Sequence, residues 1–231
     1  MSIEMVSIFS SLHKSFKRLF IFLPLIVGLL INPISANALY PSDPSSVDGL
    51  KEDLHGADLQ NNEFVKYDLS YQDLGEANLQ GAYMSVTTAQ NSSFKSANMK
   101  DLIAYAVRFD NADLSNQDLG EANLQGAYMS VTTAKNSSFK GANMKDLIAY
   151  ATRFDNADFS DANLTNGELM KSVFDGAIID GADFTDANLD LSQRKSLCER
   201  ASGTNPQTGV NTIDSLECTG LKGYMPPKPK A

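Results

Sequence analysis

Three features of the sequence predict a stacked solenoid over residues 54–189. Every fifth residue from Leu54 to Leu189 is apolar, at all 28 positions and without a slip in phase. The residue two places earlier is Ala, Gly, Ser or Thr at 20 of the 27 positions from Ala57 to Ala187. A period of five fits neither the 3.6-residue period of an α-helix nor the two-residue period of a strand. The chain must therefore turn a corner after each inward apolar residue, and stacking of the coils makes the core.

The predicted core consists of the large apolar side chains in this five-residue phase. Two inward positions hold Ala104 and Ala149, and the residue two places before each is Leu102 or Leu147. Because protein interiors are close-packed, a large neighbour beside a small central residue keeps the interior filled. Local loosening of the coil is the alternative. The core stack is expected to include Leu59, Phe64, Leu79, Phe94, Phe109, Leu124, Phe139, Phe154, Leu164, Phe174 and Phe184.

The repeated unit, Ala-Asp/Asn-Leu/Phe followed by two polar residues, resembles the pentapeptide repeat family. The resemblance implies an all-β solenoid, a right-handed quadrilateral β-helix in which four pentapeptides form each coil. The 28 pentapeptides of residues 54–189 then make about seven coils. The motifs that carry the resemblance are Ala57-Asp58-Leu59, Ala77-Asn78-Leu79, Ala122-Asn123-Leu124, Ala162-Asn163-Leu164 and Ala182-Asp183-Phe184.

Residues 1–38 have the pattern of a cleavable signal peptide. A basic region precedes an uncharged apolar stretch, Leu19–Ile31. These 13 residues are shorter than the roughly 20 that span a bilayer. Ala36 and Ala38 then fit the small-x-small cleavage rule, so the mature chain is expected to begin at Leu39. An uncleaved membrane anchor is the alternative.

A solenoid needs caps because its ends expose apolar side chains and unpaired backbone. The five-residue phase stops after Leu189, and residues 190–220 are predicted to form an α-helical cap. We expect a short amphipathic helix over residues 191–201, with Ser192 as N-cap and Gly203 as the stop. A shorter helix is expected from Thr212 to Cys218. The remaining segments are read as a linker with an N-terminal cap at 39–53 and a disordered tail at 221–231.

The segment from Leu197 to Cys218 resembles the C-terminal cap of exported pentapeptide repeat proteins of cyanobacteria and plastids. In those relatives two cysteines join the cap helices, and Cys198 and Cys218 match them. Independently, the chain has two Cys and an export signal, and an oxidising compartment favours a structural disulfide. A redox-sensing pair and a metal role are the alternatives.

Composition excludes several function classes. Loss of residues 1–38 removes three Lys or Arg and one Glu, which leaves 16 basic and 27 acidic residues and a net charge of −11. This charge argues against binding to nucleic acid or to an anionic membrane surface. His55 is the one His of the mature chain, and no phosphate loop is present, so no enzyme and no cofactor is predicted. Calcium binding is disfavoured because the repeat places successive Asp residues on different sides of a coil.

A long internal duplication tests for a repeated binding site. Residues 73–114 recur at 118–159 with four differences, at an offset of 45 residues. Nine pentapeptides make two coils and a quarter-turn, so equivalent residues should lie on adjacent faces. This geometry favours lengthening of a scaffold over multiplication of a site on one face. The pairs expected in different columns are Tyr83 with Tyr128, and Arg108 with Arg153.

These features predict a non-catalytic scaffold or protein-interaction protein of the thylakoid lumen or periplasm of a photosynthetic bacterium, with an unknown protein partner. The helical cap should block end-to-end stacking, so a monomer is expected. One alternative is the branch of the family that mimics DNA and binds gyrase, although an export signal argues against a cytosolic target. Another is a redox-responsive lumenal protein that acts through Cys198 and Cys218.

Overall fold

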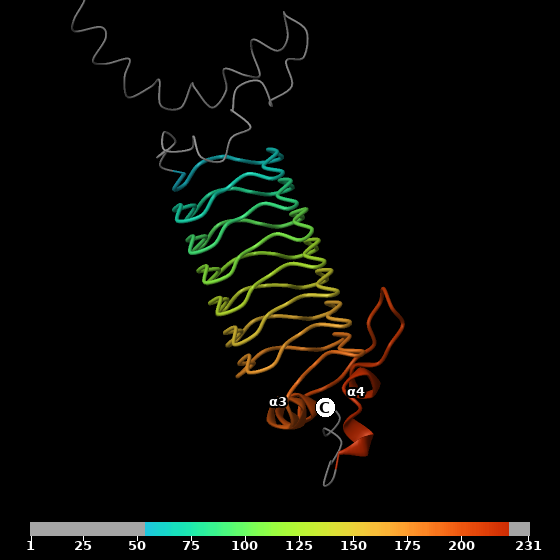
Figure 1. Ribbon diagram of the computed structural model, residues 1–231. Helices are drawn as coiled ribbons and strands as arrows, with labels where there is room; N and C mark the ends of the chain where they lie inside the picture. The colour runs from blue at the N-terminus through green and yellow to red at the C-terminus, as the bar shows by residue number, and fades with distance from the viewer. Residues whose placement is uncertain (1–53, 222–231) are drawn as a thin grey trace, which may run out of the picture. The chain divides into compact units, whose positions relative to one another are not determined.

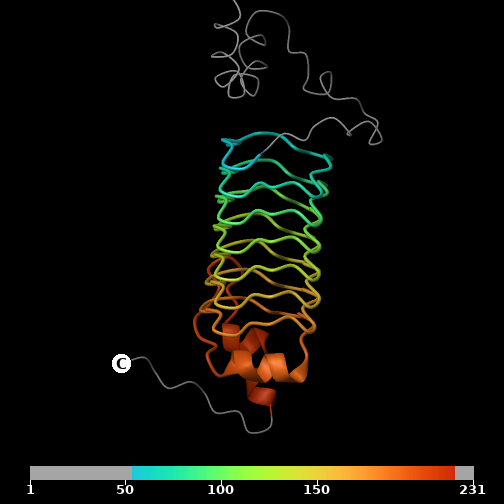
Figure 2. The same ribbon diagram turned by 90° about the vertical axis from the view of Figure 1, so that its left-hand side faces the viewer.

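The computed structural model describes residues 54–221 (Figures 1 and 2). They form a column of stacked coils, followed by helix α3 (Leu191–Cys198), helix α4 (Thr212–Ser215) and the 3₁₀ helix η3 (Cys218–Gly220). None of the helices in the described part of the chain is long and apolar enough to cross a membrane. The predictions that lie outside the described residues are the signal peptide with Ala36, Ala38 and Leu39, the linker at 39–53, and the tail from residue 222.

Each coil contains 20 residues and has four sides. In the column, 23 parallel bridges run from Asp58↔Asn78 to Glu168↔Asn188, and every one joins residues 20 apart. The bridging residue always comes directly before an inward apolar residue, and the chain turns too soon for a longer strand to form. This is the four-pentapeptide coil that the resemblance implied, built from isolated β-bridges.

Every corner places one residue in the left-handed region of the backbone. The residue two places after each inward apolar residue has positive φ at all 27 corners, where it is a glycine six times. At most corners the next N–H donates to the carbonyl of the inward residue, as Ala57 does to Leu54 at 3.1 Å. These are the features of type II β-turns, which favour Gly or Asn at this position. Val86 and Val131 occupy it at φ 60° and 59°, although a β-branched side chain is strained there.

Where the residue before an inward residue is Asp or Asn, its side chain commonly holds the following turn. Its carboxylate or amide oxygen accepts the N–H two residues later, as Asp118 does from Gly120 at 3.0 Å and Asn163 from Thr165 at 3.0 Å. Side chains of this length favour such local bonds. Many of the acidic residues that give the chain its charge are therefore bonded to their own backbone.

The predicted core residues are buried, with Phe64 in the first coil half-buried against Tyr67 at a ring separation of 6.1 Å. Phe154 and Phe174 stack in successive coils with their centroids 5.3 Å apart. Leu102, Ala104, Leu147 and Ala149 are all fully buried, which agrees with the exchange of volume between neighbouring inward positions. The column therefore has one continuous apolar interior.

The last coil is covered by α3, whose start differs from the prediction. Asp190, and not Ser192, is the N-cap: its carboxylate accepts the N–H groups of Ser192 and Gln193 at 3.0 and 2.9 Å. The Gln193 side chain accepts the Asp190 N–H at 2.7 Å, which completes a capping box that outcompetes the serine. The Gln193 amide also donates to the carbonyls of Leu169 and Ser172 at 2.8 and 2.6 Å, so α3 satisfies the unpaired end of the column.

The cap helices are shorter than predicted. The helix α3 ends at Cys198, before Ala201, and it buries only Leu197 and Cys198, so it is not amphipathic. The chain leaves the helix early because Ala201 turns into the core and is fully buried. The predicted second helix divides into α4 and η3 at Glu217, which has positive φ.

Between α3 and α4, a hairpin folds back along the column, as Figures 1 and 2 show. Its strands meet at the bridge Thr204↔Asn211, and the Asn205 amide donates to the carbonyls of Asp161, Ala162 and Gly181. Gln207 reaches further and donates to the Gly141 carbonyl at 3.2 Å. The hairpin thus ties residues 66 positions apart in sequence.

Candidate interaction surface

Large apolar side chains gather on one side of the column. Ten of them are exposed in the described residues, and eight lie on two adjacent faces or their corners. We name each face after one residue in its column of bridges. The Tyr83 face is the column Glu63, Tyr83, Ile103, Asn123, Asn143, Asn163 and Asp183, and the Tyr128 face is the column Asp68, Thr88, Arg108, Tyr128, Ile148, Glu168 and Asn188. The eight residues are Tyr71, Tyr83, Val86, Tyr105, Tyr128, Val131, Tyr150 and Met170.

Most of these side chains surround the Tyr128 face. Arg108, Tyr128 and Ile148 bridge in succession down its centre. The turn before this face carries Tyr105. Its ring reaches toward the next coil, since a Cβ atom added to Gly126 would lie 3.9 Å from the Tyr105 Cε2 atom. We define the tyrosine patch as these side chains together with those of the turns after the face: Tyr105, Arg108, Tyr128, Val131, Ile148, Tyr150, Met170 and Lys171.

Two cations in the tyrosine patch lie over aromatic rings. The Arg108 guanidinium is 5.6 Å from the centroid of the Tyr128 ring, and the Lys171 ammonium is 5.0 Å from that of Tyr150. Each such contact contributes about 0.5–1 kcal/mol at an exposed site. A hydrogen bond with the Tyr150 side chain also raises the pKa of Lys171. The cations therefore add positive charge directly beside the tyrosine rings.

One carboxylate beside the patch, that of Asp110, is already satisfied. Asp110 accepts the Gln90 amide at 3.1 Å, the Ser130 N–H at 3.2 Å and the Arg108 guanidinium at 3.4 Å. Its side chain is only 15% exposed, whereas that of Arg108 is 51% exposed. The accessible charge at this point is the guanidinium.

The duplication places its two copies on adjacent faces, as predicted. Tyr83 bridges to Ile103 and Tyr128 to Ile148, and Arg153 lies in a third column, beside Thr133. The sequence reasoning missed that the copies meet: Tyr105 from the first copy borders the face that Tyr128 from the second occupies. The faces also differ, because Glu63 precedes Tyr83 in its column where Arg108 precedes Tyr128.

The cysteine pair forms a buried crosslink. Cys198 and Cys218 are joined by a disulfide, which ties α3 to η3, and the two residues are 1% and 0% exposed. Thiol–disulfide exchange requires a thiolate to reach one of the sulfurs. Burial of both cysteines therefore protects this bond, which argues against a rapid redox sensor.

The groups considered for chemistry are scattered over the surface. The His55 imidazole is 3.4 Å from the Asp73 carboxylate, and both side chains are about half exposed or more, at 47% and 60%. The Gly75 N–H and, more weakly, His55 lower the pKa of Asp73. Residues 54–221 contain no group of three or more His, Cys, Asp or Glu arranged to hold a metal ion.

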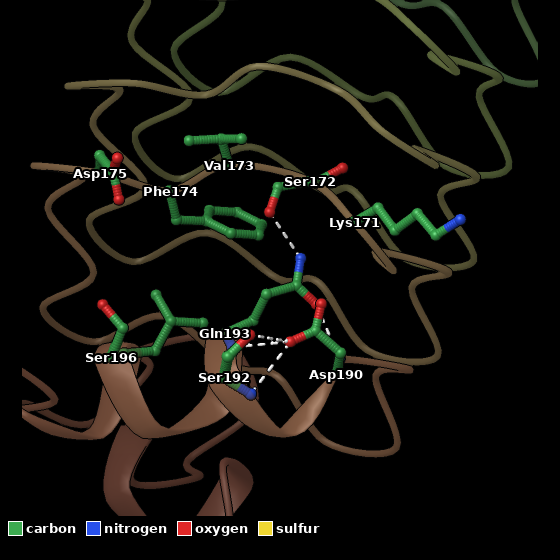
Figure 3. A pocket seen from close by; sticks show the side chains of 10 residues that line it. Lys171, Ser172, Val173, Phe174, Asp175, Asp190, Ser192, Gln193 and Ser196 are labelled. Atoms are coloured by element: carbon green, nitrogen blue, oxygen red, sulfur yellow. Dashed lines mark hydrogen bonds between the residues drawn. The ribbon is translucent and has the colours of Figure 1, made fainter.

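A cleft of about 410 Å³ lies between the last coil and α3, as Figure 3 shows. Phe174 and Leu197 form its apolar lining, and Asp190 and Gln193 contribute polar groups. Both polar side chains are engaged in the capping box and in the contacts to the last coil. The cleft is therefore a seam of the cap, and the tyrosine patch is the stronger candidate site.

Comparisons with known proteins find the same repeat in other chains. A family model for pentapeptide repeats matches residues 108–146 and 152–190, with eight copies. No curated protein matches the chain. Similar solved structures include full-length QnrB1, a plasmid-mediated fluoroquinolone resistance protein, with 17% identity, 63% of this chain and 94% of that chain covered, and a TM-score of 0.38.

Two further structures share the repeat. A pentapeptide repeat protein of the Arabidopsis thaliana thylakoid lumen is 26% identical over 75% of this chain and 97% of its own, with a TM-score of 0.21. HetL, a pentapeptide repeat protein involved in heterocyst differentiation regulation in the cyanobacterium Nostoc, is 14% identical over 55% of this chain and 89% of its own, with a TM-score of 0.25. Both segments that the family model matches lie within the 20-residue coils, so this part of the chain is similar to pentapeptide repeats in sequence and in coil length.

Proposed function

We propose that this protein is a non-catalytic interaction scaffold that is exported to the thylakoid lumen or periplasm. The observation that carries the proposal is the concentration of exposed tyrosine and aliphatic side chains on two adjacent faces of a regular column. Soluble proteins rarely expose such patches unless they bind a partner, and Tyr and Arg are enriched where binding energy is concentrated. The patch offers contact area on a rigid support.

Two features support export, and a third feature, the segment after the column, supports a monomeric state. The signal pattern at residues 1–38 directs the chain out of the cytosol, and the disulfide Cys198–Cys218 suits an oxidising compartment. We further propose that residues 54–189 form about seven coils and that residues 190–220 act as a cap. In this proposal the cap keeps the column monomeric by covering the last coil.

The gyrase-binding alternative receives less support from the surface. A mimic of DNA needs rows of unneutralised negative charge that replace phosphates. The Tyr128 face has two carboxylates among its seven bridging residues, and its centre is occupied by Arg108, Tyr128 and Ile148. In the other columns Asp is interrupted by uncharged residues, and carboxylates such as that of Asp118 bond to their own turns.

The proposal is tested by crosslinking the mature protein in a fractionated lumen or periplasm and identifying what it retains. We expect the crosslinking to retain one protein partner at a defined stoichiometry. We also expect N-terminal sequencing to find Leu39 as the first residue of the mature chain. Recovery of the chain in the cytosol with its first residues intact would contradict the export. Turnover of any small molecule by the mature protein would contradict the non-catalytic role.

A further inference from the structure

The tyrosine patch has a spacing that suits one kind of ligand. Tyr105, Tyr128 and Tyr150 follow one another at intervals of 23 and 22 residues, which is one coil plus three or two residues. With about 4.8 Å between coils and about 3.3 Å for each residue along a side, Tyr128 and Tyr150 lie about 8 Å apart. The step from Tyr105 to Tyr128 passes through the turn at Ala106, which shortens it to less than about 11 Å. They form a diagonal row from one corner of the Tyr128 face to the other.

A polyproline II helix repeats at a similar distance. It has three residues per turn and a rise of about 3.1 Å per residue, so the same edge of the peptide returns about every 9.3 Å. Grooves lined by aromatic side chains bind such helices in several domain families, since the peptide is extended before it binds and loses little conformational entropy. The three tyrosines are 51%, 38% and 42% exposed, so their rings are available for this contact.

The charge of the patch selects among such peptides. The Arg108 guanidinium and the Lys171 ammonium lie beside the tyrosine row, whereas Asp110 is satisfied by three donors. An incoming carboxylate would meet the exposed Arg108 guanidinium, and an incoming lysine there would meet a like charge. The exposed Glu168 lies one coil beyond Ile148 in the same column, where one of its oxygens accepts the Asn188 amide at 2.7 Å, so the preference for acid is confined to the Arg108 end of the row. Ile148, Val131 and Met170 supply apolar area on and beside the face but no side-chain hydrogen-bonding groups, which suits a peptide better than a hydroxyl-rich sugar.

We propose that the tyrosine patch binds an extended, proline-rich segment of a partner protein that carries an acidic residue opposite Arg108. The proposal rests on the proposed scaffold function and specifies the surface and the partner chemistry. The tyrosines make the repeating contact with the prolines, and Arg108 sets the preference for acid. The Tyr83 face lacks this preference because Glu63 lies where Arg108 lies on the Tyr128 face.

The duplication supplies a matched control. Tyr83 and Tyr128 lie in the same local sequence, Gly-Ala-Tyr-Met-Ser-Val, but on different faces. Tyr83→Ala and Tyr128→Ala therefore remove the same exposed side chain from the same local backbone. A peptide that adhered to any exposed tyrosine would respond equally to both changes.

The test measures binding of fluorescent peptides to the mature, disulfide-bonded protein at about 0.15 M salt. The probes are an acidic proline peptide, PPEPPEPPEPP, its lysine counterpart, PPKPPKPPKPP, and the flexible control GSEGSEGSEGS. We expect the acidic proline peptide to bind most tightly. Tyr128→Ala should weaken its binding about tenfold, Arg108→Gln should abolish the preference for acid over lysine, and Tyr83→Ala should change it less than twofold.

Several results would overturn the inference. They are equal weakening by Tyr83→Ala and Tyr128→Ala, equal binding of the flexible peptide, absence of binding by all three peptides, competition by a neutral oligosaccharide such as cellohexaose, or self-association lost in Tyr128→Ala. Circular dichroism of each variant excludes unfolding as the cause. If a crosslinked partner is still retained by the Tyr128→Ala, Tyr150→Ala protein, the scaffold function stands and the assignment to this patch fails.

Discussion

The two valines in left-handed turns predict an unusual gain of stability from exposed polar substitutions. Val86 and Val131 have φ of 60° and 59°, where an L residue with a β-branched side chain pays about 1–2 kcal/mol. Asn populates this region readily and occupies seven of the equivalent corners in this chain. Each Val→Asn change should therefore raise the free energy of unfolding by about 1 kcal/mol. The sites lie on different corners, so the double variant should gain about 2 kcal/mol.

The measurement is urea or guanidinium unfolding of the mature protein, with thermal melting as a second readout. For a protein of this size, 1 kcal/mol corresponds to a shift of about 2–4 °C in Tm. Val65→Asn is the control, since Val65 is the first residue of a turn and is not among the residues with positive φ. It should change stability by less than about 0.5 kcal/mol. Destabilisation by Val86→Asn, or an equal gain from Val65→Asn, would refute the strain argument.

Three further predictions concern packing, the disulfide and the helix cap. Leu102→Ala should lower the free energy of unfolding by about 2–5 kcal/mol, and Ala104→Leu should lower it by about 1–3 kcal/mol. The Leu102→Ala, Ala104→Leu double variant should recover most of this stability in urea unfolding, and additive losses would rule out volume exchange. Replacing both Cys198 and Cys218 by Ser should lower the free energy of unfolding by about 3 kcal/mol, since the disulfide joins residues 20 apart. An unchanged unfolding midpoint would contradict this prediction. The Ser192 hydroxyl and the Gln193 N–H lower the pKa of Asp190 in the folded protein. The Asp190 carboxylate therefore contributes its full stabilisation of the fold above the unfolded pKa of about 3.9, and this stabilisation is lost as the pH falls through the folded pKa. Asp190→Asn should flatten this acid dependence in unfolding from about pH 2 to 6, and Asp190→Ala should lose about 1 kcal/mol at pH 7; unchanged acid dependence in Asp190→Asn would contradict the assignment.

The phase of the column could be read from the sequence because it depends on one residue in five. Leu59 and Phe154 are inward for the same local reason, and their burial follows from the repeat. The quarter-turn between Tyr83 and Tyr128 followed from counting pentapeptides. These features could be predicted because each depends on spacing along the sequence and not on the identity of distant neighbours.

Other features depend on contacts that spacing cannot reveal. Val86 adopts positive φ against its own preference, because stacking of the coils imposes the turn. The N-cap moved from Ser192 to Asp190 because Gln193 bonds both to Asp190 and to the last coil. The hairpin contact between Gln207 and Gly141 joins residues 66 apart, and no local pattern marks it. The tyrosine patch was missed because its members come from both copies of the duplication and from the coil that follows the second copy.

The coil of 20 residues is tested most directly by disulfide trapping between engineered cysteines. Ser138 and Asp158 form a bridge on one face, and Asn163 lies one pentapeptide further, on the next face. Cysteines bond when their Cα atoms are about 4.4–6.8 Å apart, which neighbouring coils satisfy. The Ser138→Cys, Asp158→Cys protein should crosslink within each chain on mild oxidation, and Ser138→Cys, Asn163→Cys should not. Crosslinking of the second pair without the first would contradict the four-sided column.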